Sequence, residues 1–249
     1  MSKVSRIEEL YIEFTTRCNL KCVYCLHSTS AYKERIKDLN PEEFYHTLDI
    51  LMKELDVRGI STTGIGEFTL MKNWRNIIQY IQEIYPYVTI SLFSNFARKL
   101  SDEEIDTLTK VKRINISMDT VDPELFHFLR SGDVSILLDN IHHLNERCKI
   151  TESKLYRTIA SVVNSRNIDY LEELLDYIIE NKIADELMLT PMTLPLPAAK
   201  LLDVYPVSIY FNEEKADYIA FLLKKLHEKG KKNGIKVSWS GDLQDFYCC

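Results

Sequence analysis

The chain has 249 residues, of which 45% are hydrophobic and 27% are charged, and its formal net charge is −6 at pH 7. Such a chain can bury a substantial core as one large domain, or as one domain with a short appendage. No apolar run approaches the roughly 18 residues that a membrane span needs, the N-terminus lacks the apolar stretch of a secretory signal, and the acidic balance argues against a general binder of polyanions. We therefore expect a cytoplasmic protein without a membrane or nucleic-acid partner.

Segments typical of strands and helices alternate along the first half of the chain. Alternate apolar positions over residues 10–14 predict a first strand, and Asn40 followed by Pro41 predicts the start of a helix, because asparagine caps helices and proline fits their first position. A strand ending at residues 61–67 comes next, then a helix with apolar residues at three- and four-residue steps, and the strand 88–95. This repetition is typical of βα units on a parallel sheet.

The alternation continues in the second half of the chain. A helix capped by Ser101 precedes a fourth strand at residues 113–119, and one long helical region is expected from Asp122 to about Cys148. The remaining predicted elements are a strand at residues 155–164, a helix containing residues 171–179, a strand at residues 186–192 and a last helix near residues 212–230.

Six βα units are fewer than the eight that close a barrel. The predicted fold is therefore α/β, a partial (β/α)6 TIM-like barrel that is open on one side and carries a short C-terminal extension. A proline-marked stretch places the predicted boundary between a barrel core, residues 1–195, and an extension of loop, helix and terminal cysteines, residues 196–249. The chemistry of such folds lies where the parallel strands end.

The cysteines are unevenly distributed along the chain. Three of the six, Cys18, Cys22 and Cys25, directly follow the first predicted strand. This clustering is unlike a disulfide framework, and in a reducing compartment it more often indicates a metal site. A structural zinc site would need a fourth ligand, for which His27 is the nearest choice. A four-iron cluster held by three thiolates would instead leave one iron open to a substrate or cofactor.

The spacing Cys18-x3-Cys22-x2-Cys25 after the first strand of a βα barrel resembles that of the radical S-adenosylmethionine (radical SAM) enzymes. The resemblance implies a [4Fe-4S] cluster on these cysteines, with the amino and carboxylate groups of SAM on the open iron. It also implies that the reduced cluster cleaves SAM to methionine and a 5′-deoxyadenosyl radical, which removes a hydrogen atom from the substrate. The resemblance extends over residues 8–192.

Further motifs at the predicted strand ends are similar to those of this family. Tyr24 corresponds to the aromatic residue that packs beside the adenine of SAM. Gly64, Gly66 and Glu67 resemble the glycine-glycine-glutamate motif, in which backbone groups and a carboxylate receive the SAM amino group. The motif departs from the family pattern because Ile65 separates the two glycines.

The ends of the third and fourth predicted strands also carry residues similar to those of this family. Asn95 lies in a segment similar to the family's threonine-asparagine-glycine ending, with Phe96 in place of the glycine. Ser117 and Asp119 resemble the residues that approach the SAM carboxylate, the ribose or the substrate, and they share a side of their strand because strand side chains alternate. Arg130 resembles the arginine of an Arg-Gly turn, where a cation could neutralise a carboxylate; the alternative is a solvated helix end.

Many members of this family continue into a cysteine-rich extension of the SPASM or twitch type, whereas the C-terminal segment of this chain carries only two cysteines. We expect either that the chain lacks the extension, or that it is a shortened form of a longer protein, or that the two cysteines pair with another chain. Cys248 and Cys249 are adjacent, and two adjacent thiols cannot enclose a cluster. We expect either a hydrogen-donor role or an auxiliary-ligand role for them, or no function at all in a frayed terminus.

These observations predict a radical SAM enzyme with a [4Fe-4S] cluster and SAM as cofactors and a flavodoxin or ferredoxin as electron donor. The preferred substrate is a small molecule, sugar-like or nucleotide-like, that undergoes epimerisation, dehydrogenation or dehydration. The alternatives are modification of a ribosomal peptide, a non-catalytic iron–sulfur or zinc module, and an inactive barrel scaffold.

Overall fold

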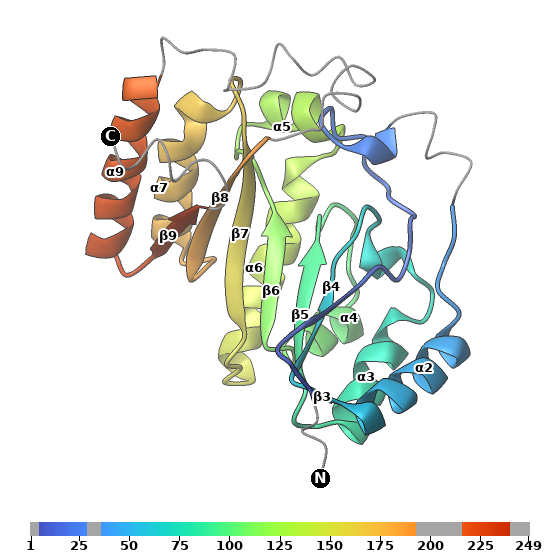
Figure 1. Cartoon of the computed structure of the whole chain (residues 1–249). Coiled ribbons are helices and arrows are strands. Elements are labelled where there is room, and N and C mark those ends of the chain that lie inside the picture. The colour runs from blue at the N-terminus through green and yellow to red at the C-terminus, as the bar shows by residue number, and fades with distance from the viewer. Residues whose placement is uncertain (1–4, 29–35, 193–215, 240–249) are drawn as a thin grey trace.

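The computed structural model describes residues 5–28, 36–192 and 216–239, and its centre is a parallel sheet (Figure 1). The sheet has seven strands in the order β2-β4-β5-β6-β7-β8-β9, and each neighbouring pair is parallel. Their bounds are β2 (Leu10–Ile12), β4 (Gly59–Thr62), β5 (Thr89–Ser94), β6 (Arg113–Ser117), β7 (Tyr156–Val163), β8 (Glu186–Pro191) and β9 (Lys236–Trp239). A separate two-stranded sheet pairs β1 (Ser5–Ile7) with β3 (Leu55–Val57).

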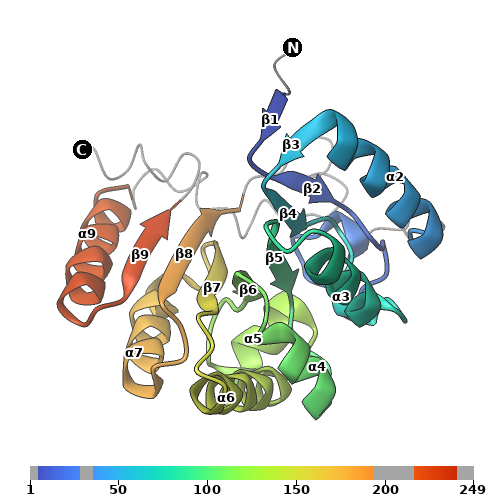
Figure 2. The ribbon, with the colours of Figure 1, turned by 90° about the horizontal axis from the view of Figure 1, so that it is seen from below.

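The helices lie on the outer side of this curved sheet, as the view from below shows (Figure 2). They are α2 (Pro41–Glu54), α3 (Trp74–Ile84), α4 (Asp102–Leu108), α5 (Pro123–Arg130), α6 (Val134–Ile150), α7 (Leu171–Asn181) and α9 (Ala216–Lys232). Strands β2 and β9 form the two edges of the described sheet and do not pair with each other. The prediction of an open, partial barrel is therefore confirmed. None of the described helices has the length and apolarity that crossing a membrane requires.

The local signals for the helix starts are confirmed. The Asn40 side chain accepts a hydrogen bond from the Glu42 N–H at 3.0 Å, with Pro41 in the first turn of α2. At α4, Ser101 and Glu104 form the reciprocal capping box, which satisfies two of the backbone N–H groups that a helix start leaves without partners.

The helical region expected from Asp122 to about Cys148 consists of two helices, α5 and α6, which separate directly after Arg130, where the resemblance implied an Arg-Gly turn. Ser131 adopts a left-handed conformation with φ 56° and ends α5, and Asp133 then caps α6 by accepting from the Ser135 N–H at 2.8 Å. The turn between the helices packs against the cysteine loop, since a Cβ on Gly132 would lie 2.9 Å from the Leu20 side chain.

Strand β9 was not expected. It is only four residues long and follows α9 after a short turn at Gly234, where φ is 75°. The predicted domain boundary at residue 195 lies outside the described residues. Beyond it, α9 and β9 are described, and β9 pairs with β8 in the main sheet.

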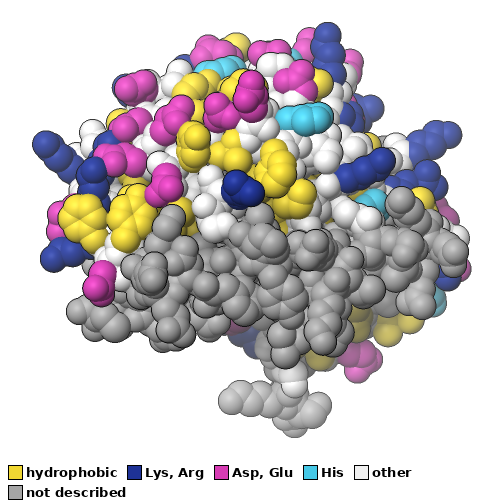
Figure 3. All heavy atoms as spheres, turned by 90° about the horizontal axis from the view of Figure 1, so that it is seen from above, with side chains coloured by type: hydrophobic (Ala, Val, Ile, Leu, Met, Phe, Trp, Pro, Cys, Tyr) yellow, Lys and Arg dark blue, Asp and Glu magenta, His cyan; other side chains and the backbone are white. Residues whose placement is uncertain are grey.

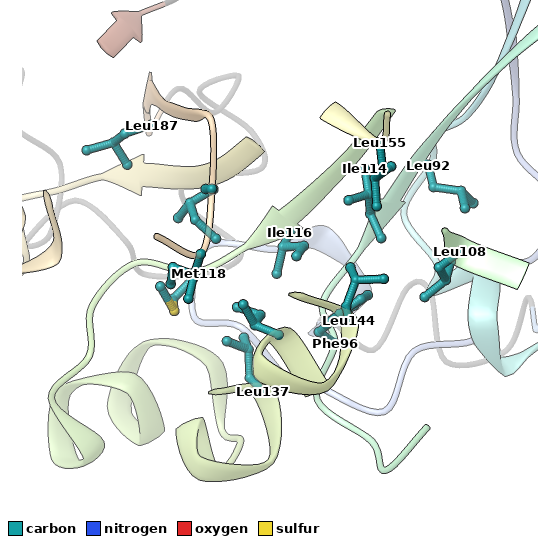
Figure 4. Close-up of a cluster of buried hydrophobic side chains, with 14 of the residues drawn as sticks. Leu92, Phe96, Leu108, Ile114, Ile116, Met118, Leu137, Leu144, Leu155 and Leu187 are labelled. Atoms are coloured by element: carbon teal, nitrogen blue, oxygen red, sulfur yellow. The ribbon is translucent and has the colours of Figure 1, made fainter. Parts of the chain in front are cut away.

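The hydrophobic core lies between the sheet and the helices (Figure 4). Ile114 and Ile116 of β6 are fully buried there, together with Leu144 of α6. Because strand side chains alternate, the intervening residues, such as Asn115 and Ser117, face the inner, concave side. The inside of a closed barrel is usually filled by branched apolar side chains. Here that side is more polar, and it leads to the strand ends where the cysteines lie.

Candidate active site

The three clustered cysteines line one cavity of about 220 Å³ at the carboxyl ends of the strands. The Cys18–Cys25 loop follows β2 and lies at the top of Figure 1. Leu20 and Tyr24 of the same loop also line the cavity. The other lining residues come from the ends of β4 to β7 and from α5; they are Thr63, Gly64, Ile65, Gly66, Glu67, Phe93, Ser94, Asn95, Ser117, Arg130 and Val162. The structure thus brings nearly all of the predicted site residues around one space.

Burial of the three thiols favours their neutral form. It raises the pKa of Cys18 and Cys25, and it raises the pKa of Cys22 to about 12. Backbone N–H groups oppose this rise: Leu20 donates to Cys18 and His27 to Cys25. Cations can also compensate buried thiolates, and Arg130 lies close enough to Cys22 and Cys25 to lower the pKa of both. Metal binding must therefore displace protons from these thiols.

The donor set fits a polynuclear cluster better than a single ion. Among residues 5–28, 36–192 and 216–239, no three His, Cys, Asp or Glu side chains converge closely enough to hold one metal ion. His27 does not line the cavity that the three cysteines share. The zinc alternative with His27 as fourth ligand is therefore not supported. In a [4Fe-4S] cluster each thiolate binds a different iron, so three thiols around a shared cavity are the suitable arrangement.

A buried ion pair joins the cysteine loop to β6 and α5. Arg130 donates to both oxygens of Asp119, through Nε at 2.8 Å and Nη2 at 3.0 Å. The Tyr24 hydroxyl donates to Asp119 Oδ2, and the Val162 N–H donates to Oδ1 at 2.8 Å. Asp119 is completely buried and Arg130 is 4% exposed, so the alternative of a solvated Arg130 is wrong. Protein groups engage both oxygens of Asp119, which does not line the cavity, whereas Ser117 does.

The charges of this pair are mutually stabilised. Burial opposes the charge of Arg130, but the adjacent Asp119 carboxylate outweighs it, so the pKa of the guanidinium is raised above its ordinary value. Burial, and the charge of Asp119, raise the pKa of Tyr24 well above 10. Tyr24 is therefore a neutral hydrogen-bond donor, and its ring lies 5.7 Å from the Arg130 guanidinium carbon.

The glycine loop after β4 packs directly on the cysteine loop. A Cβ on Gly66 would lie 2.0 Å from the Thr15 carbonyl oxygen, and the Glu67 N–H donates to the Arg17 carbonyl oxygen at 2.6 Å. Gly66 is therefore required for contact between two protein segments. In addition, the Ile65 N–H donates to Glu13 Oε1 at 2.7 Å, which fixes the residue that interrupts the glycine pair.

Glu67 joins the ends of β4 and β5. Its Oε1 accepts from Ser94 Oγ at 2.8 Å and from the hydroxyl and N–H of Thr69. Its Oε2 accepts from the Asn95 N–H at 2.6 Å. Glu67 is 3% exposed, so a hydrogen-bond network of this kind is what makes burial of the carboxylate tolerable.

Two residues at the end of β5 have roles that the sequence pattern does not reveal. Asn95 donates from Nδ2 to Cys18 Sγ at 3.7 Å. Phe96 is 1% exposed and has φ 52°, the left-handed conformation that favours glycine. Phe96 therefore differs from the family's glycine in its side chain, whereas its backbone has the conformation that glycine favours.

Asn140 was missed in the sequence. From α6 its Nδ2 donates to the Phe96 and Arg98 carbonyl oxygens at 2.9 and 2.6 Å, and its Oδ1 accepts from the Leu100 N–H at 3.1 Å. The only available signal was an amide among apolar positions of a predicted helix. The predicted residues Cys248 and Cys249 lie outside the described residues.

The fold and the site define a class of protein, and comparison with known families identifies it. Residues 12–178 match the model of the radical SAM superfamily, so the chain belongs to this superfamily. It is an enzyme of the kind that uses a [4Fe-4S] cluster and SAM.

Particular relatives are found among curated proteins. The chain is 27% identical over 185 residues to a GTP 3′,8-cyclase of Peptoclostridium acidaminophilum. The aligned region covers 72% of this chain and 54% of the relative. It is 30% identical over 180 residues to a probable GTP 3′,8-cyclase of Methanococcus aeolicus, with 69% of this chain and 55% of the relative covered. The chain thus spans about half the length of these relatives.

Solved structures show the same fold. The SuiB protein of Streptococcus suis bound to S-adenosylmethionine superposes with a TM-score of 0.73 at 19% identity, over 98% of this chain and 53% of SuiB. The protein anSMEcpe with bound AdoMet superposes with a TM-score of 0.67 at 20% identity, over 94% of this chain and 63% of anSMEcpe.

Proposed function

We propose that Cys18, Cys22 and Cys25 hold the cluster and that SAM binds in the adjoining cavity. The observation that carries the proposal is that the three thiols and the predicted SAM-contacting residues Tyr24, Gly66, Ser117 and Arg130 line one cavity. When bound, the reduced cluster and SAM supply the 5′-deoxyadenosyl radical that abstracts hydrogen from the substrate.

The chain's own residues bind and orient SAM in this proposal. Arg130 uses Nε and Nη2 for Asp119, which leaves Nη1 for the SAM carboxylate, and Ser117 lines the same cavity. The Tyr24 ring packs by the adenine, held in place through its hydroxyl bond to Asp119. The carboxylate of Glu67 is engaged by Thr69, Ser94 and Asn95, so the backbone of the glycine loop is the better partner for the SAM amino group.

The substrate is proposed to be a small, nucleotide-like molecule. The support is that curated relatives at 27–30% identity are named GTP 3′,8-cyclases. On the described part of the upper face, acidic and basic side chains are mixed around apolar ones (Figure 3). This part of the surface therefore lacks the continuous basic patch that binds a polynucleotide. A peptide substrate has weaker support, because the SuiB structure with its precursor peptide is only 18% identical to this chain.

Anaerobic reconstitution tests this function directly. With dithionite in place of the expected flavodoxin or ferredoxin, the protein should convert SAM to 5′-deoxyadenosine. Substitution of Cys18, Cys22 or Cys25 by alanine should abolish both iron binding and formation of 5′-deoxyadenosine. Cys148→Ala is the matched control, since this thiol lies on α6 outside the cavity.

A substrate panel then separates the candidates. GTP, other purine nucleotides, nucleotide sugars and short peptides are compared for stimulation of 5′-deoxyadenosine formation, with deuterated versions used to detect hydrogen transfer. Transfer from a nucleotide supports the proposal, whereas transfer from a peptide alone would replace it. Absence of 5′-deoxyadenosine from protein shown to hold four irons would contradict the enzyme function itself.

A further inference from the structure

The hydrogen bond from Asn95 to Cys18 depends on which way the amide faces, and the main chain settles this. The Ala97 N–H, which can only donate, lies 2.9 Å from the Asn95 side-chain oxygen Oδ1. That side of the amide must therefore be the oxygen. The NH2 group then faces Cys18 Sγ at 3.7 Å and Asn19 Oδ1 at 2.9 Å.

The orientation of Asn19 is fixed in the same way. Its Nδ2 donates to the Ala97 carbonyl oxygen at 2.9 Å, and a carbonyl can only accept. Its Oδ1 is thus the atom that receives a hydrogen from Asn95. The N–H and C=O of Ala97 thus orient both amides. A flip of either side chain would place a donor against a donor or an acceptor against an acceptor.

The backbone of Asn95 is held as firmly as its side chain. Its N–H donates to the buried Glu67 carboxylate at 2.6 Å, and Asn95 is 8% exposed. The second hydrogen of Nδ2 therefore has little freedom to point anywhere but at the sulfur. Cys18 also receives the Leu20 N–H, so this one thiol has two donors, one from its own loop and one from the end of β5.

We propose that Asn95 is a positioning residue that raises the reduction potential of the cluster through its hydrogen bond to Cys18. Reduction adds an electron whose charge spreads onto the ligand sulfurs, and hydrogen bonds to these sulfurs strengthen as they become more negative. A donor aimed at a thiolate therefore stabilises the reduced cluster more than the oxidised one. The inference rests on the proposed function in one respect, that Cys18 is a cluster ligand.

The test is a redox titration of the reconstituted cluster followed by its EPR signal. Asn95→Leu removes the donor without adding charge, and Asn95→Asp keeps the acceptor for the Ala97 N–H while removing the donor. Both should shift the midpoint to more negative potential. At a fixed ambient potential, the ratio of reduced to oxidised cluster should fall roughly three- to tenfold for the leucine variant, from the partial loss of one charge-assisted hydrogen bond, and further for the aspartate variant.

Asn140→Leu is the matched control for Asn95→Leu, because neither substitution adds a charge. Asn140 is also a buried asparagine that holds the loop after β5, but it bonds to main-chain carbonyl oxygens and not to a sulfur. It should lower stability and leave the potential unchanged. Equal shifts in the Asn95 and Asn140 variants, or a wild-type potential in Asn95→Leu, would overturn the inference. A wild-type chain that assembles no cluster on Cys18 would instead refute the proposed function.

Discussion

At the scale of single residues, Phe96 is one of four non-glycine residues with a positive φ in the described part of the chain, and it is the buried one among them. Its φ of 52° is left-handed, which costs an L-residue about 1–2 kcal/mol. The side chain is almost fully buried in the core cluster (Figure 4), and burial of a phenylalanine contributes about 1.5–3 kcal/mol. The strain is therefore tolerated because the ring packs, and because Asn140 holds the Phe96 carbonyl.

Substitutions at Phe96 should reverse the usual order of alanine and glycine. Both Phe96→Ala and Phe96→Gly lose the ring, at a cost of roughly 3–5 kcal/mol in the free energy of unfolding. The glycine variant should be the more stable of the two by about 1 kcal/mol, because it alone adopts this φ without strain. Urea unfolding of the metal-free protein measures this difference.

Phe126 provides the control for that comparison. It is also fully buried but lies inside α5, where alanine should be more stable than glycine by about 1 kcal/mol. The same order at both positions would show that the left-handed backbone of Phe96 has no energetic weight.

Removal of one partner of the buried Asp119–Arg130 pair should destabilise the protein more than replacement of both partners. Asp119→Asn leaves the Arg130 charge buried without a counter-charge, which should lower the free energy of unfolding by about 3–5 kcal/mol. Addition of Arg130→Met removes the orphaned charge, so the double variant should be less destabilised than the sum of the two single variants. Strict additivity in this double-mutant cycle would argue against direct coupling.

At the scale of elements, the cysteine loop is fixed by its neighbours on two sides. On one side the Val23 N–H donates to the Leu129 carbonyl oxygen at 2.9 Å, and Ser131 Oγ donates to the Lys21 carbonyl oxygen at 3.2 Å. On the other side the glycine loop after β4 packs at Gly66. The thiols are therefore positioned by protein contacts, which is the preorganisation that a binding site requires.

Gly66→Ala should disrupt this packing. The added Cβ would lie 2.0 Å from the Thr15 carbonyl oxygen, so the two loops must separate, with an expected loss of stability of about 2 kcal/mol or more and at least tenfold weaker SAM binding. Ile65→Ala, one residue away on the same loop, is the control and should cost far less stability. Calorimetric titration with SAM and urea unfolding check both outcomes; wild-type values for Gly66→Ala would refute the close approach.

The sequence was informative where structure is set by local rules. The helix caps at Asn40 and Ser101 and the strand ends that carry the motifs were predicted, because capping and side-chain alternation act within a few residues. The sequence did not decide whether Arg130 is buried, because only tertiary packing brings its partner Asp119 to it. The turn after Arg130 was implied by the resemblance, but the left-handed conformation of Ser131 was not predicted, since a serine carries no strong signal for it.

At the scale of the whole molecule, the core and the candidate site are physically separate. The core lies between sheet and helices, whereas the thiols line a cavity at the strand ends. Removal of the metal by a chelator should therefore leave the helical far-UV circular dichroism unchanged and lower Tm by a few degrees, since each kcal/mol of lost binding corresponds to about 2–4 °C in a chain of this size. Collapse of the helical signal would show that the fold depends on the metal.

The most direct test of the central claim is the EPR spectrum of the reduced, reconstituted protein recorded with and without SAM. In the proposed site three cysteine ligands leave one iron that SAM can reach, so the signal of the reduced [4Fe-4S] cluster should change in shape and g-values when SAM is added. A cluster signal that SAM leaves unaltered would mean that the chain itself occupies the fourth position, and it would contradict the proposed site.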